Sequence, residues 1–177
     1  VKDTENLSDV MHQAFYVATH GRPGPVLVDI PKDVQFATGG YRAPQAAAKL
    51  PYAPRTEGDP EMIERMVEMI ETAERPILYT GGGVINSGPE ASRLLRELAE
   101  ATGFPLTSTL MGLGAYPASG RLWLGMLGMH GTYEANMAMH GCDAMFNIGA
   151  RFDDRITGRL DAFSPGSRKV HVDIDPS

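Results

Sequence analysis

The sequence predicts an α/β protein built on a doubly wound parallel sheet. From residue 59 onward, segments with apolar residues at helical spacing alternate with short, almost wholly apolar segments typical of strands buried on both faces. Helices and strands that alternate in this way are joined by right-handed crossovers, which make the strands parallel and place helices on both faces of the sheet. We therefore expect a Rossmann-like fold for this part of the chain.

Each element of the alternating part has its own signal. Pro60 suits a helix start and Gly103 suits a helix stop, and apolar residues recur at helical spacing after Pro60 and before Gly103. The predicted helices cover residues 60–73, 89–102 and 131–140. The predicted strands cover residues 76–80, 105–109, 143–149 and 169–174.

The first part of the chain is organised differently. Apolar residues at helical spacing over 7–18 predict a helix, and the apolar run 25–30 predicts a strand. One helix and one strand cannot make a domain, so we interpret residues 1–35 as the C-terminal remnant of a preceding domain. Residues 36–58 are rich in glycine and proline and are predicted to be a linker. Residues 59–177 then form the alternating domain, which we expect to be cut before its last strand.

Composition narrows the class of protein. A hydrophobic content of 42% and a charged content of 21% are ordinary for a soluble globular protein. The net charge of -6 and the pI near 5.3 argue against non-specific binding to nucleic acid or to an anionic membrane. No apolar run approaches the ~20 residues needed to span a bilayer. The single cysteine, Cys142, suggests a reducing compartment, and we expect it to be a small buried side chain.

Charged residues gather after the third predicted strand. The segment 149–155 carries Arg151, Asp153, Asp154 and Arg155 at a strand end, which is where open α/β sheets bind ligands. Two arginines there suit an anionic group such as a pyrophosphate or a carboxylate. The alternative interpretation is a solvated turn held by its own salt bridges.

Glycines mark the other strand ends. Gly81–Gly83 follows the first predicted strand and favours close approach of the main chain to a dinucleotide, or else a tight turn with positive φ. The segment is not G-x-G-x-x-G, and no acid closes the second strand, so another dinucleotide is favoured over NAD. In 109–114 and 124–131 glycines alternate with bulky apolar residues, a pattern that can line a flat ring system. His130 could cap the next helix, stack on such a ring or serve as a structural residue at the helix start.

The sequence does not indicate a metal-binding site or a hydrolase. The five histidines have no metal-ligand spacing, and we expect no metal site. The sequence lacks a G-x-S-x-G elbow, a P-loop and a paired-carboxylate signature.

These segments resemble a known family. The stretch from Gly21 to Asp33 resembles the end of the pyrimidine-binding domain in thiamine diphosphate enzymes. Together with the segments 127–131 and 150–155, it makes the chain similar, nearly end to end, to the large catalytic subunit of the acetolactate synthase (acetohydroxyacid synthase) family. The middle domain of these enzymes holds FAD, which is structural in this family and does not turn over.

The resemblance implies roles for individual residues. The implied FAD-binding residues are Arg22, Gly81, Gly82, Gly83, Thr109, Leu110, Met111, Leu127, Gly128, Met129, His130, Gly149, Ala150, Arg151, Asp153, Arg155, Ile156, Asp173 and Ile174. The implied substrate-channel residues are Lys32, Met129, Asp154 and Arg155. Arg155 is also the candidate for holding the carboxylate of the second 2-ketoacid.

The resemblance also implies a reaction and partners. Family members join pyruvate to a second pyruvate or to 2-ketobutyrate, on the way to branched-chain amino acids. They use thiamine diphosphate and Mg²⁺, form dimers or tetramers, and can carry a regulatory small subunit. The glutamate that activates thiamine and the G-D-G…N motif for Mg²⁺ have no counterpart in these residues. We therefore expect a catalytically inactive fragment, and a cytoplasmic location if the source is bacterial.

Three alternatives stay open at this point. A sister enzyme, such as glyoxylate carboligase or pyruvate oxidase, shares the first motif. A non-catalytic dinucleotide-binding module would share the alternating domain alone. A structural interaction domain without a ligand describes what the fragment could do by itself.

Overall fold

The computed structural model describes residues 1–44 and 52–175, and the chain divides into two compact units. The larger unit is Gly58–Asp173, and the smaller unit is Val1–Glu57 with Ile174–Ser177. Residues 45–51 of the predicted linker and 176–177 of the predicted final domain lie outside the described residues.

The larger unit contains one five-stranded parallel sheet, with the strand order β3-β2-β1-β4-β5. Its strands are β1 (Pro76–Thr80), β2 (Leu106–Ser108), β3 (Trp123–Met126), β4 (Ala144–Ile148) and β5 (Arg168–Val172). Its helices are α3 (Pro60–Thr72), α4 (Gly82–Asn86), α5 (Pro89–Thr102), α6 (Tyr133–Gly141) and α7 (Asp154–Thr157). Short 3-10 turns are η3 (Leu110–Gly112) and η4 (Leu160–Ala162).

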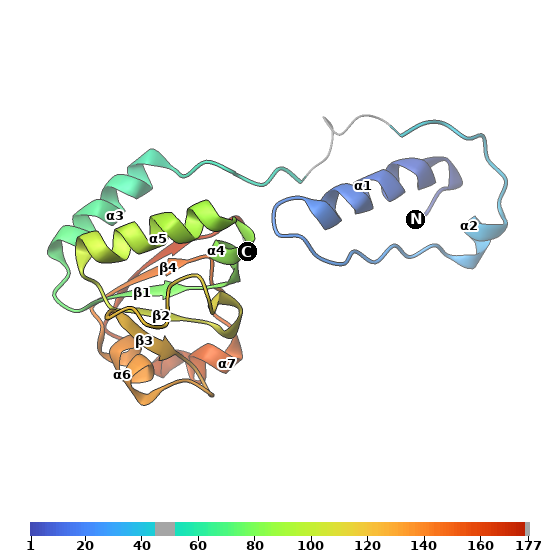
Figure 1. Ribbon diagram of the computed structural model, residues 1–177. Coiled ribbons are helices and arrows are strands. Elements are labelled where there is room, and N and C mark those ends of the chain that lie inside the picture. The colour runs from blue at the N-terminus through green and yellow to red at the C-terminus, as the bar shows by residue number, and fades with distance from the viewer. Residues whose placement is uncertain (45–51, 176–177) are drawn as a thin grey trace. The chain divides into compact units, whose positions relative to one another are not determined.

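Helices cover both faces of this sheet, which confirms the predicted doubly wound fold (Figure 1). On one face, α3 and α5 pack through Met69 and Leu95 against strand residues such as Leu78. On the other face, α6 packs through Met139 against residues such as Ile77. The central strands β1 and β4 thus alternate their side chains between two apolar cores, which explains why these two strands read as almost continuous apolar runs.

The structure corrects the predicted strand count. We expected four strands, but β3 forms between the second and third of them, within a segment predicted to be loop. Gly125 interrupts the apolar pattern of β3 and has φ +97, and the pairing of β3 with β2 is irregular. Thr107 stabilises this short edge strand by donating from Oγ1 to the Gly125 carbonyl oxygen at 2.9 Å.

The smaller unit contains η1 (Thr4–Asn6), α1 (Leu7–Thr19) and α2 (Lys32–Phe36). The predicted first helix is confirmed as α1. The strand predicted over 25–30 is wrong, since these residues join no sheet, and Leu27 is 90% exposed. A strand needs a neighbour for its main-chain hydrogen bonds, and the described part of this unit contains no other strand.

Candidate functional site

The candidate site lies at the carboxyl edge of the sheet in the larger unit. Because all five strands are parallel, the segments that follow β1, β2, β3 and β4 emerge at this one edge. The chain order reverses between β1 and β4, which are neighbours in the sheet although two strands separate them in sequence. A switch point of this kind is where open α/β sheets form a ligand crevice.

The glycines after β1 lie directly against the segment after β4. Gly81 N donates to Ile148 O at 3.1 Å, and Gly83 N donates to Gly149 O at 2.9 Å. A Cβ on Gly81 would overlap the Gly149 carbonyl oxygen, and one on Gly83 would lie 2.7 Å from Gly149 Cα. None of the three glycines has a positive φ, so the tight-turn interpretation is wrong. Gly81 and Gly83 are glycines because two main chains approach here without room for a side chain.

The segment after β2 packs on this junction. Thr109 N donates to Thr80 O at 2.9 Å, and Thr109 Oγ1 accepts from Gly112 N at 3.1 Å. A Cβ on Gly82 would lie 3.1 Å from Met111 Cβ, so η3 covers the start of α4. The Leu110 and Met111 side chains remain 67% and 73% exposed. They offer apolar surface at the rim of the edge.

The segment after β3 is joined to the start of α7. Asn136 holds Gly128 by two bonds, accepting from its N–H at 2.8 Å and donating to its carbonyl at 3.1 Å. Met129 N donates to Arg155 O at 2.9 Å, and the Met129 side chain is 63% exposed. A Cβ on Gly128 would lie 2.9 Å from the Cδ1 atom of Ile156. Two of the predicted segments therefore meet at this point.

His130 is not the cap of α6. Thr132 caps this helix, because its Oγ1 accepts from Ala135 N at 3.2 Å. His130 is exposed in the preceding turn. A stacking role for His130 stays a prediction.

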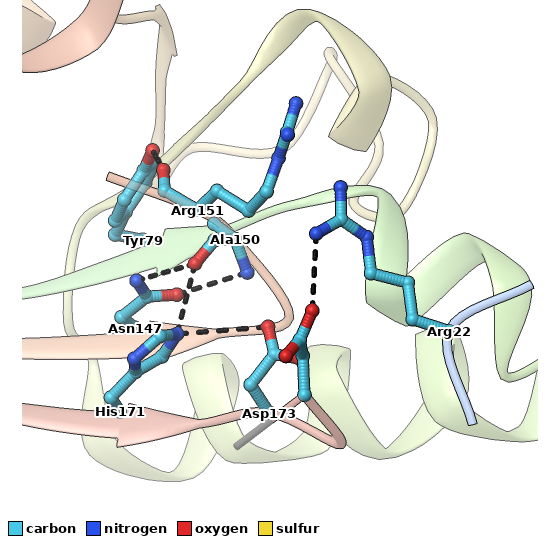
Figure 2. Close-up of polar contacts among 8 residues, drawn as sticks. Arg22, Tyr79, Asn147, Ala150, Arg151, His171 and Asp173 are labelled. Atoms are coloured by element: carbon cyan, nitrogen blue, oxygen red, sulfur yellow. Dashed lines mark hydrogen bonds and ion pairs between the residues drawn. The ribbon is translucent and has the colours of Figure 1, made fainter. Parts of the chain in front are cut away.

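The segment after β4 is held from below by side chains of three strands (Figure 2). Asn147 makes two bonds to Ala150, donating to its carbonyl at 2.8 Å and accepting from its N–H at 3.0 Å. His171 Nε2 also bonds the Ala150 carbonyl oxygen at 3.0 Å, and the Tyr79 hydroxyl donates to Arg151 O at 2.9 Å. Burial raises the pKa of the Tyr79 phenol well above its usual range, so the phenol stays a donor even in alkaline solution.

Charged side chains of this segment point in different directions. Asp153 caps α7, since its Oδ1 accepts from Arg155 N at 3.1 Å. Arg151 is exposed, and Asp154 and Arg155 form a solvated pair at 3.9 Å. An exposed pair at this distance contributes little. The turn is held by Asn147, Tyr79 and His171, so the interpretation as a turn held by its own salt bridges is wrong.

The remaining predicted residues are Asp173 and three residues of the smaller unit. Asp173 ends the larger unit and lies 3.6 Å from His171 Nε2. Arg22, Lys32 and Ile174 belong to the smaller unit. In that unit Arg22 pairs with Asp175 at 3.2 Å, and the Lys32 ammonium lies 5.9 Å from the centre of the Phe36 ring.

Sequence reasoning missed the residues that hold the site. Tyr79, Asn147 and His171 lie inside strands and were not singled out for the site. The available signal was a polar residue within an otherwise apolar strand, since such a residue is costly to bury unless it is bonded.

The described residues contain neither a membrane-spanning helix nor a metal-ligand group. No helix among residues 1–44 and 52–175 is long and apolar enough to cross a membrane. The same residues contain no group of three or more His, Cys, Asp or Glu side chains placed to hold a metal ion.

Comparison with known proteins gives a consistent set of relatives. The family model described as "Thiamine pyrophosphate enzyme, central domain" matches residues 63–177. The acetolactate synthase isozyme 3 large subunit of Escherichia coli (strain K12) is 45% identical over 179 residues, covering 100% of this chain and 31% of the relative. The chloroplastic acetolactate synthase of Arabidopsis thaliana is 46% identical, covering 99% of this chain and 26% of the relative. The acetolactate synthase of Mycobacterium bovis (strain ATCC BAA-935 / AF2122/97) is 45% identical, covering 100% and 28%. The chain thus spans between about a quarter and a third of the length of these relatives.

Proposed function

This chain belongs to the thiamine pyrophosphate enzyme family as a central domain, and from that premise we propose that it is the FAD-binding middle section of an acetolactate synthase. The observation that carries the proposal is the carboxyl edge of the sheet. Exposed arginines there stand beside exposed apolar side chains, on main-chain segments that are hydrogen-bonded to one another.

The residues at this edge fit the two halves of FAD. Arg151 and Arg155 are exposed and would grip the diphosphate, because guanidinium forms paired bonds with phosphate oxygens. Leu110, Met111 and Met129 would cover the flat ring with apolar surface. The bound flavin would supply a structural platform without turning over. The other FAD residues implied by the resemblance, Arg22, Asp173 and Ile174 among them, stay predictions.

The proposed reaction of the whole enzyme is the condensation of two 2-ketoacids. The relatives described above are all named acetolactate synthases, which does not favour a glyoxylate carboligase or a pyruvate oxidase. Arg155 would hold the carboxylate of the second ketoacid, and Met129 and Asp154 would line the same channel. The role of Lys32 stays a prediction from the resemblance. Thiamine diphosphate and Mg²⁺ would be held by parts of the enzyme outside the segment aligned here. We therefore expect no acetolactate from pyruvate with these 177 residues alone.

Assembly and location complete the proposal. We expect the enzyme to be a dimer or tetramer of its catalytic chain, located in the cytoplasm if the source is bacterial. The Escherichia coli relative is named a large subunit, which supports the further expectation of a regulatory small subunit.

An FAD titration tests the binding site. The chain is titrated with FAD while quenching of flavin fluorescence is recorded, for the unmutated chain, for Arg151→Ala and for the control Arg96→Ala on the exposed side of α5. We expect saturable quenching that Arg151→Ala weakens at least about tenfold, as for the loss of a charge-assisted hydrogen bond of 1.5–3 kcal/mol. The proposal fails if quenching does not saturate, or if both substitutions have the same effect.

A chimera tests the reaction. This chain replaces the aligned segment of the Escherichia coli isozyme 3 large subunit, and acetolactate formation from pyruvate is assayed with the small subunit present. We expect measurable activity, and a large loss on adding Arg155→Ala. A chimera that folds and binds FAD without making acetolactate would contradict the proposed reaction while leaving FAD binding intact.

A further inference from the structure

Four polar side chains form one row across the sheet, on a single face. Thr107 in β2 is paired in register with Tyr79 in β1. Tyr79 is paired on its other side with Asn147 in β4, which is paired in turn with His171 in β5. Side chains at paired positions of neighbouring strands point to the same face. We call Thr107, Tyr79, Asn147 and His171 the polar row, and Figure 2 shows the last three of them.

Every member of the polar row bonds a main-chain carbonyl oxygen beyond its own strand. Thr107 bonds Gly125, at 2.9 Å. The other three converge on two consecutive residues: Asn147 and His171 bond the Ala150 carbonyl at 2.8 and 3.0 Å, and Tyr79 bonds that of Arg151 at 2.9 Å. A carbonyl oxygen only accepts, so His171 Nε2 carries the proton in this bond.

A polar side chain buried at these positions lowers the stability of the fold unless it forms hydrogen bonds that an apolar side chain cannot form. Tyr79 and Asn147 are fully buried in a parallel sheet covered on both faces, where valine or leucine would pack without a desolvation cost. Their bonds fix the main chain of Ala150, which is itself buried, and of Arg151, whose side chain is exposed. The guanidinium of Arg151 therefore extends from an anchored main chain, and only its own torsions stay free.

We propose that Tyr79, Asn147 and His171 are positioning residues, which anchor the main chain of Ala150 and Arg151 so that the Arg151 guanidinium meets the anionic part of the bound ligand. This inference takes the identity of the ligand, FAD, from the proposed function. The anchoring of the main chain does not depend on the proposed function. An anchored arginine binds an anion with less loss of conformational freedom than one on a mobile turn.

Two members of the row can be substituted with little damage to the core. Tyr79→Phe removes one oxygen atom and keeps the ring, which packs against Phe152 at a centroid distance of 5.9 Å. His171 lies on the edge strand with its side chain 39% exposed, so His171→Ala opens no cavity. His171→Gln returns an N–H donor to the same place and serves as the rescue. Asn147 is left intact, because its loss would strip two bonds from the centre of the sheet.

Amide hydrogen exchange measured by mass spectrometry tests the anchoring without any ligand. We expect exchange in peptides covering 147–155 to rise about tenfold in Tyr79→Phe and in His171→Ala, as for the loss of one partly buried hydrogen bond, and to return toward normal in His171→Gln. Exchange in α5 should not change. The controls are Tyr116→Phe, a buried tyrosine packed on the opposite face, and His140→Ala, an exposed histidine on α6. An unchanged loop, or an equal rise in loop and α5, overturns the inference.

A double-mutant cycle tests the link to the ligand. Tyr79→Phe should weaken FAD binding about fivefold when Arg151 is present and have no effect when combined with Arg151→Ala, because Tyr79 acts through that side chain. Equal weakening in both backgrounds would overturn the positioning role. If the unmutated chain binds no FAD, the proposed function fails alone, and the exchange result still decides whether the polar row anchors the loop.

Discussion

Replacing Gly81 with alanine tests how closely the first and fourth strand ends are joined. The Gly81 backbone, with φ -130 and ψ -172, is open to any residue, so the substitution adds a methyl group without backbone strain. That methyl group would overlap the Gly149 carbonyl oxygen and lie 2.4 Å from the Ala150 Cα atom. Real Cβ atoms essentially never come within 3.0 Å of a non-bonded heavy atom, so Ala150 must move by about 0.6 Å, the difference of these values, and the carbonyl by more.

The expected loss in the free energy of unfolding follows from the atoms that must move. Overpacking in a close-packed site costs about 1–3 kcal/mol, and the clash here involves main-chain atoms that cannot swing aside. Separating the two segments also weakens two bonds that join them, from Gly81 N to Ile148 O and from Gly83 N to Gly149 O, each contributing about 1 kcal/mol. We expect the free energy of unfolding to fall by about 3 kcal/mol.

Urea unfolding followed by the fluorescence of Trp123, the single tryptophan, measures this change within the larger unit. With a slope of about 2 kcal/mol per molar urea, the midpoint should fall by about 1.5 M. Gly141→Ala is the matched control, because a Cβ there meets nothing within 4 Å and the residue ends α6. It should raise stability by up to about 1 kcal/mol. A Gly81→Ala midpoint equal to that of the unmutated chain would refute the reasoning.

Three further predictions concern other parts of the larger unit. The main-chain N–H groups of Glu74 and Arg75 donate to the Asp143 carboxylate and hold its pKa below the usual value. The stability that this carboxylate adds is therefore present at neutral pH and is lost on acidification through the lowered pKa. Asp143→Asn should flatten the fall in Tm below pH ~4, measured by circular dichroism. Burial raises the pKa of Cys142, so its reaction with a thiol reagent at pH 8 should be slow in the native chain and complete in urea; fast native labelling would contradict this. Asn136→Ala should cost about 1–3 kcal/mol in urea unfolding, because both groups of a loop glycine lose their partner; a cost near zero would show that water replaces it.

Much of the larger unit could be predicted because its signals are local. Helices α3 and α5 are predicted by a proline at the start of each and by the helical spacing of their apolar residues. Gly103, with φ +70, ends α5. The strand β3 could not be predicted, because its pairing depends on the Thr107 side chain of a neighbouring strand. The run 25–30 has the composition of a strand, but the described residues of its own unit contain no strand with which it could pair.

The candidate site, too, could be predicted from the sequence only in part. The strand-end segments were predictable, since parallel topology alone brings them to one edge. What holds them was not, because Tyr79, Asn147 and His171 meet only through the register of three strands. The close main-chain approach expected at the glycines 81–83 is present for Gly81 and Gly83, but the partner is the main chain at Gly149, and their contact with FAD stays a prediction.

Mapping amide chemical shifts in a ¹⁵N-labelled sample during an FAD titration would show whether FAD binds at the carboxyl edge of the sheet, as we propose. A chain of 19.1 kDa suits this measurement. We expect saturable shifts concentrated in residues 81–83, 109–112, 127–131 and 149–155, with the outer faces of α3 and α5 unaffected. Saturable shifts centred on the opposite edge of the sheet, or none at saturating FAD, would contradict it.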